Sequence, residues 1–89
     1  MSGGHFDHAY FRVQTFTEEI NEEIAKNDMK DGEGYSHGFP PEVIQALMAI
    51  SAHADVSARL MKAAEWLYEG DTSTESFMKS FREILGYQD

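Results

Sequence analysis

The chain has 89 residues, no cysteine and a formal net charge of −9 at pH 7. This length fits one domain, residues 1–89, with a thin core. The lack of cysteine excludes disulfides and cysteine-ligated metal sites. General binding to duplex nucleic acid is excluded as well, because neutralising phosphates requires a basic surface. The chain shows neither a signal peptide nor an apolar stretch long enough for a bilayer, so we expect a soluble cytoplasmic protein without a membrane partner.

The first helix is predicted over residues 8–26. Residues 1–4 are glycine-rich and expected to be flexible, and Asp7 is the expected N-cap. A competing start lies at Thr15, which forms a capping box with Glu18 and would leave residues 5–14 as an extended arm. Side chains with helical spacing follow at Tyr10, Val13, either Phe16 or Thr17, Ile20 and Ile24.

Residues 27–39 are rich in Asn, Asp, Gly and Ser and predict a loop. A loop of this length is unusual in so small a domain. Because Tyr35, His37 and Phe39 lie within it, we expect an ordered loop folded over an apolar surface.

A long helix is predicted over residues 41–69. Pro41 suits the first helical turn, and Gly70 supplies the left-handed residue that ends the helix. Two adjacent apolar rows predict a wide buried face. The first row is Leu47, Ile50, Ala54, Ser57, Met61, Ala64 and Tyr68; the second is Ala49, His53, Val56, Leu60, Ala63 and Leu67.

This helix is too long for the domain. It spans roughly 43 Å at 1.5 Å per residue, whereas a compact chain of this size has a diameter of about 31 Å. The middle of the helix, residues 46–58, is rich in Ala and Ser, which allow close approach of another backbone. We therefore expect a homo-oligomer, a dimer or higher, crossing there. The alternative is a kink near residues 51–53 that folds the helix back within one chain.

A third helix is predicted over residues 73–85. Thr72 and Glu75 form a capping box at its start, and Gly86 ends it. Its apolar face contains Phe77, Phe81, Ile84 and Leu85. The predicted fold class is all-α: three helices, short, long and short, with no strand.

Few side chains indicate chemistry. His5, Asp7 and His8 form an H-x-D-H pattern, but adjacent positions do not share one helix face, so we predict no metal site. There is no nucleophile elbow and no phosphate-binding glycine loop, and we predict a non-enzyme without a cofactor.

Four residues of the long helix have expected structural roles. His53 is expected to be half-buried across a helix contact, and Asp55 and Arg59 to form a surface ion pair. Trp66 is expected to pack on the last helix.

Three short motifs stand out, at residues 3–8, 41–44 and 65–77. Together they resemble a family of small proteins carried by phages and other bacterial mobile elements. Gly3-Gly4-His5-Phe6-Asp7-His8 resembles the family's G-G-H/Y-F-D/N-Y start, although His8 stands where tyrosine is expected. Pro41-Glu42-Val43-Ile44 resembles its P-E-x-I helix start. The stretch from Glu65 to Asp71, with Glu75-Ser76-Phe77, resembles its ending, with Thr72-Ser73-Thr74 in place of Asp-Gly-Glu. The resemblance implies expression inside a bacterial host and transfers no residue role.

Small helical proteins in that setting often block host defence, and two mechanisms are considered. In the first, the oligomer sequesters a nucleotide immune signal at subunit interfaces. The candidate ligand-binding residues are His5, Phe6, Tyr10, Arg12 and Tyr35, because aromatics and a lone arginine gather there. In the second, residues 18–23 imitate nucleic acid and inhibit a host defence enzyme. A structural or regulatory role within the mobile element is a third interpretation.

Overall fold

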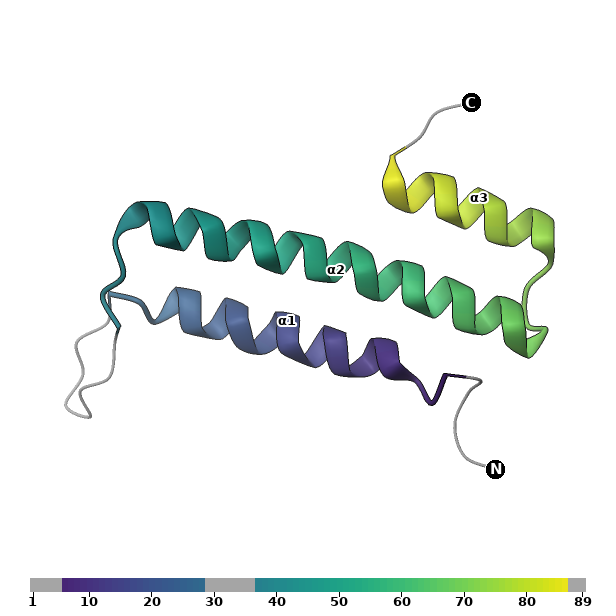
Figure 1. Cartoon of the computed structure of the whole chain (residues 1–89), viewed down its shortest axis with the longest axis horizontal. Coiled ribbons are helices and arrows are strands. Elements are labelled where there is room, and N and C mark those ends of the chain that lie inside the picture. The colour runs from purple at the N-terminus through teal and green to yellow at the C-terminus, as the bar shows by residue number, and fades with distance from the viewer. Residues whose placement is uncertain (1–5, 29–36, 87–89) are drawn as a thin grey trace.

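The computed structural model describes residues 6–28 and 37–86, which form three helices and no strand. They are α1 (Ala9–Ala25), α2 (Pro41–Glu69) and α3 (Thr74–Leu85). The predicted all-α class with a short, a long and a short helix is therefore confirmed (Figure 1). Among the described helices, none combines the length and the apolar character that crossing a bilayer requires.

The ends of α2 and α3 follow from local signals. Pro41 occupies the first turn of α2, and Gly70 ends the helix with a left-handed φ of 82°. Gly86 ends α3 in the same way, with φ 79°. The predicted Thr72 capping box is wrong. Ser73 is the N-cap of α3, and its Oγ accepts a hydrogen bond from the Ser76 backbone N–H at 3.0 Å.

The start of α1 differs from the prediction. Asp7 is not the N-cap, because His8 holds that position with φ 53° and no side chain caps the helix. The alternative start at Thr15 is also wrong: Thr15 lies inside α1, where its hydroxyl donates to the Phe11 carbonyl at 3.0 Å. A tertiary contact of His8 with α2, described below, holds this helix start instead of a local cap.

The three helices lie side by side in one layer (Figure 1). α1 and α3 each pack on α2, on its two sides, and the described helices α1 and α3 make no contact with each other. The molecule measures 51 × 38 × 13 Å, and its thickness is that of one helix with side chains. Its radius of gyration is 17.1 Å, whereas a compact chain of this length would have about 12 Å. α2 is one uninterrupted helix, so the predicted alternative of a kink near residues 51–53 is wrong.

The contact between α1 and α2 is built on a line of residues spaced by seven. Ser51, Ala58 and Glu65 are the buried residues of α2, and seven-residue spacing keeps them on one side of the helix. The Ser51 hydroxyl donates to Asn21 Oδ1 at 2.7 Å, and Glu65 Oε2 accepts from the His8 backbone N–H at 3.2 Å. Two small residues of the 46–58 segment, Ser51 and Ala58, therefore face α1 of the same chain.

α3 covers only the C-terminal half of α2, because it has 12 residues against the 29 of α2. At the other half, Ala49 and His53 of the second apolar row are exposed. The prediction of a half-buried His53 is therefore wrong. Ala58 is the only apolar side chain that is buried among the described residues. One layer of helices has no second layer to enclose a core.

Asn27 closes the connection between α1 and α2. Its side chain donates to the Phe39 carbonyl and accepts from the Phe39 N–H, both at 3.0 Å, and is 6% exposed. The Gly38 N–H donates to the Asn27 carbonyl at 3.1 Å. His37 stacks on Phe39 with ring centroids 5.0 Å apart. The rest of the predicted ordered loop, including Tyr35, lies outside the described residues.

Candidate functional site

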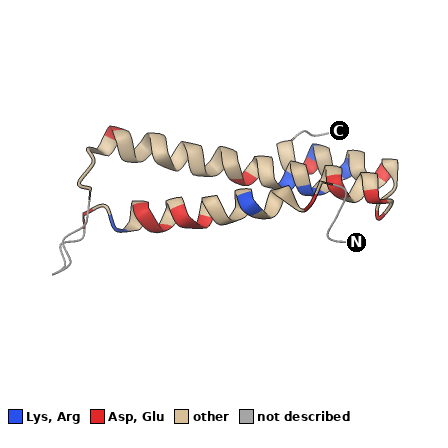
Figure 2. Ribbon diagram, turned by 60° about the horizontal axis from the view of Figure 1, so that its bottom comes forward, with Lys and Arg blue, Asp and Glu red and all other residues tan. Residues whose placement is uncertain are grey.

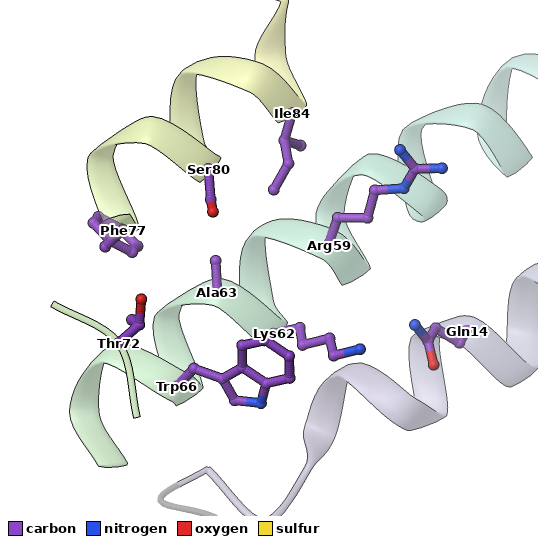
Figure 3. A pocket seen from close by; sticks show the side chains of 9 residues that line it. All are labelled: Gln14, Arg59, Lys62, Ala63, Trp66, Thr72, Phe77, Ser80 and Ile84. Carbon is purple, nitrogen blue, oxygen red and sulfur yellow. The ribbon is translucent and has the colours of Figure 1, made fainter. Parts of the chain in front are cut away.

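The candidate site is a cavity of about 260 Å³ between α2 and α3, reached by one side chain of α1. We call it the α2/α3 cavity. After the Gly70 turn α3 runs back beside the C-terminal part of α2 (Figure 1), and the cavity lies between these two helices. Its lining, shown in Figure 3, consists of Gln14, Arg59, Lys62, Ala63, Trp66, Thr72, Phe77, Ser80 and Ile84.

Trp66 and Lys62 form the aromatic and cationic part of the cavity. They are one helical turn apart on α2, and the Lys62 Nζ lies 4.9 Å from the centroid of the Trp66 ring. The same ammonium lies 5.7 Å from the Tyr10 ring of α1. Contacts of this kind hold a cation against aromatic faces. Trp66 is nevertheless 43% exposed, so part of its ring is open to a ligand.

The polar groups of the cavity favour an anion. Arg59 is the second cation, and its guanidinium forms an ion pair with Asp55 at 3.1 Å, which confirms the predicted pair. Because Asp55 partly neutralises Arg59, Lys62 is the cation that remains more available to an anionic ligand. The hydroxyls of Thr72 and Ser80 lie on the other side of the cavity (Figure 3).

The sequence predicts that Trp66 packs on the last helix. In the structure its ring lines the cavity together with Thr72, from the turn before α3, and Phe77, from α3 itself. An aromatic surface, a cation and hydroxyl groups around one cavity are the features that bind a flat anionic molecule.

The predicted ligand-binding residues lie apart from the α2/α3 cavity. Phe6 and Tyr10 line a second hollow of about 290 Å³, on the other side of α2, together with Ala9, Met61, Ala64 and Glu65. The Phe6 ring meets Tyr68 edge to face, with centroids 5.5 Å apart. Arg12 is exposed on α1 and lines neither space. His5 and Tyr35 lie outside the described residues.

Glu65 is an acid buried at the edge of this second hollow. It is 1% exposed, and its Oε2 lies 3.0 Å from His8 Nδ1 and 3.2 Å from the His8 backbone nitrogen, which donates to it. His8 and Asp7 both have left-handed backbones, with φ 53° and 58°. Such a conformation costs a non-glycine residue roughly 1–2 kcal/mol. A charge-assisted bond to Glu65 offsets part of that strain, and it places Phe6 against α2.

Sequence reasoning missed Lys62 and Arg59 as cavity residues and Glu65 as a buried acid. For Glu65 a signal existed, because it continues the seven-residue spacing of Ser51 and Ala58. For the two cations no local signal existed, because their role depends on where α3 lies. In the described ranges 6–28 and 37–86, no three His, Asp or Glu side chains gather as metal ligands would.

Comparison with protein-family models, with curated proteins and with solved structures finds no match to this chain.

Proposed function

We propose that this protein is a non-catalytic binding protein that takes a nucleotide or a similar flat anion into the α2/α3 cavity. The observation that carries the proposal is the pairing of Trp66 with Lys62, 4.9 Å apart, in a cavity that also presents hydroxyl groups. A base would stack on Trp66, its phosphate would meet Lys62, and other polar groups of the ligand would meet the hydroxyls of Thr72 and Ser80.

The energies of these contacts suit a mononucleotide-sized ligand. Stacking of a base on an aromatic side chain contributes about 1–3 kcal/mol. A charge-assisted hydrogen bond to phosphate adds about 1.5–3 kcal/mol. The cavity of about 260 Å³ is slightly smaller than most small-molecule sites, whose volumes are roughly 300–1,000 Å³. A ligand much larger than a mononucleotide would extend into solvent or toward a second subunit.

In the setting that the sequence resemblance implies, binding would withdraw a nucleotide immune signal from a bacterial defence system. The protein would then act as a phage or mobile-element anti-defence protein by sequestration, as a homo-oligomer. The sequence placed the ligand at a subunit interface. The α2/α3 cavity supports a site within one chain, since its lining comes from the three helices and the turn before α3 of a single chain.

Trp66 provides a direct test. It is the only tryptophan of the chain, so its fluorescence reports on the cavity alone. Titration with adenosine monophosphate, and separately with a cyclic dinucleotide, is expected to quench this fluorescence in a saturable manner. If neither nucleotide changes the emission at millimolar concentration, the proposed site is wrong.

Two matched variants test whether the ligand binds at Lys62 in the α2/α3 cavity. Lys62→Gln removes the cation beside Trp66, and we expect about 10–100-fold weaker nucleotide binding, which corresponds to one lost charge-assisted bond. Arg12→Gln removes an exposed arginine outside the cavity and is expected to leave the affinity unchanged. An equal loss in both variants would indicate that net charge, and not the cavity, governs binding.

Protein purified from a bacterial host tests the functional class. We expect native mass spectrometry to show a retained small molecule, and heating to release an intact nucleotide. Release of a chemically altered nucleotide would contradict the non-catalytic assignment, because it would require an enzyme.

A second candidate function rests on the acidic face of α1. Its four glutamates are all exposed within two helical turns and appear as the red bands of α1 in Figure 2; they are Glu18, Glu19, Glu22 and Glu23. Such a surface can imitate nucleic acid toward a basic host protein. Capture of a basic protein, with an affinity that falls steeply as salt is raised, would favour this function over nucleotide sequestration.

A further inference from the structure

One face of the α1/α2 pair is mainly apolar, and the acid that lines its hollow, Glu65, is buried. On α2 this face is the first apolar row of the sequence, with steps of three and four residues, and Met61 and Ala64 of this row line the second hollow beside Ala9 of α1. Val13, Phe16 and Ile20 continue from Ala9 with the same spacing and therefore lie on the same side of α1. We call this surface the apolar face. It consists of Phe6, Ala9, Val13, Phe16 and Ile20 with Leu47, Ile50, Ala54, Ser57, Met61, Ala64 and Tyr68.

Large apolar side chains of this face are open to solvent. The exposed fractions are 45% for Phe6, 44% for Phe16, 48% for Ile50 and 64% for Tyr68. The layer is only 13 Å thick, and Ala58 is the sole buried apolar side chain in the described part of the chain. Stable domains pack two layers around a core, so this face needs a second layer.

The distribution of charge on the surface allows a second copy of the chain to form the second layer. Two chains of net charge −9 repel each other, and a contact between them is therefore favoured where no charge is present. The α2 row of the apolar face contains no charged residue, and no Lys, Arg, Asp or Glu lies between Glu42 and Asp55 (Figure 2). The opposite side of α2 carries a charged row instead, which includes Asp55, Arg59 and Lys62.

We propose that two copies stack through the apolar face about a two-fold axis at Ala54 and Ser57, perpendicular to α2. Small side chains at the centre allow the two antiparallel α2 helices to approach closely. Ile50 lies roughly 8 Å before this axis along α2, and Met61 lies about the same distance beyond it, at 1.5 Å per residue. The axis therefore places Ile50 of each copy over the hollow beside Met61 of its partner. A two-fold contact requires a surface that is complementary to itself. The protruding Ile50 and the hollow beside Met61, both on the apolar face, meet this requirement.

The area is sufficient for a stable dimer. The row from Leu47 to Tyr68 is about 32 Å long, and two helices side by side are about 18 Å wide. This gives roughly 600 Å² in plan, and the corrugation of the side chains brings it toward the roughly 800 Å² that each partner buries in a standard interface. The α2/α3 cavity lies on the other side of α2. An experiment can therefore disprove dimer formation without disproving ligand binding in the cavity, and the reverse also holds.

Cysteine cross-linking tests the axis directly. The chain has no cysteine, so Ser57→Cys introduces a single thiol. A disulfide requires Cα atoms within about 7 Å, which only a residue beside the axis satisfies. We expect mild oxidation to convert Ser57→Cys into covalent dimer on a non-reducing gel. Ala52→Cys, which is also exposed but lies on the charged side of α2, is expected to stay monomeric. Cross-linking of Ala52→Cys without Ser57→Cys would overturn the proposed face.

A charge placed on the face provides an independent measurement. We expect wild-type protein to be dimeric in light scattering at micromolar concentration. Ile50→Arg is expected to raise the dimer dissociation constant about a hundredfold or more, since it buries an unpaired charge. Met48→Arg is the matched control, because Met48 is 55% exposed on the side of α2 away from the face. Circular dichroism establishes that both variants remain helical. A monomeric wild type, or dissociation by Met48→Arg alone, would overturn the proposal.

Discussion

Replacing Ala58 by leucine should test the contact between α1 and α2 most sharply. Ala58 is fully buried. The contacts of Asn21 with Ser51 and of His8 with Glu65 hold α1 on either side of it, so α1 cannot slide away from a larger side chain. Overpacking of a buried site costs about 1–3 kcal/mol. A loss of about 2 kcal/mol lowers the melting temperature of a domain of this size by about 8–16 °C.

Thermal unfolding followed by circular dichroism at 222 nm measures this loss. Ala52→Leu is the control, because Ala52 is exposed on the same helix and alanine and leucine have similar helix propensities. All proteins are compared at one concentration, since dimer formation would make the melting temperature depend on it. Equal melting temperatures for the two variants would refute the reasoning, because they would mean that α1 does not cover Ala58.

Three further variants test single contacts. Glu65→Gln weakens the charge-assisted bond to His8 by about 1–2 kcal/mol, and we expect faster hydrogen exchange in the first turn of α1; unchanged protection there would show that this bond does not hold the helix start. Asn27→Ala removes both hydrogen bonds to Phe39 and is expected to lower the free energy of unfolding by about 1–2 kcal/mol; an unchanged midpoint in urea titration would show that these bonds do not stabilise the connection between α1 and α2. Ser73→Ala removes the N-cap of α3 and should cost about 1 kcal/mol, with a shift of the urea midpoint as the readout and a threonine variant as the conservative control.

Local signals determined the elements. α2 has the bounds that Pro41 and Gly70 set, and α3 ends where Gly86 allows a left-handed turn. The Asp55–Arg59 ion pair likewise depends only on spacing within one helix. These features are encoded within a few residues of where they occur, because helix caps and side chains four residues apart interact without help from the rest of the chain.

Tertiary structure decided the rest. The two apolar rows that were predicted to form the buried face of α2 contain neither Ser51 nor Ala58, although these residues are buried and the row residues are not. Which side of α2 faces α1 depends on the contacts from Asn21 and His8. The start of α1 was mispredicted for the same reason, since Glu65 holds His8 from 57 residues away. The α2/α3 cavity depends on the direction that α3 takes after Gly70. Residues distant in the chain meet only once the helices are placed, and their energies then outweigh local preferences.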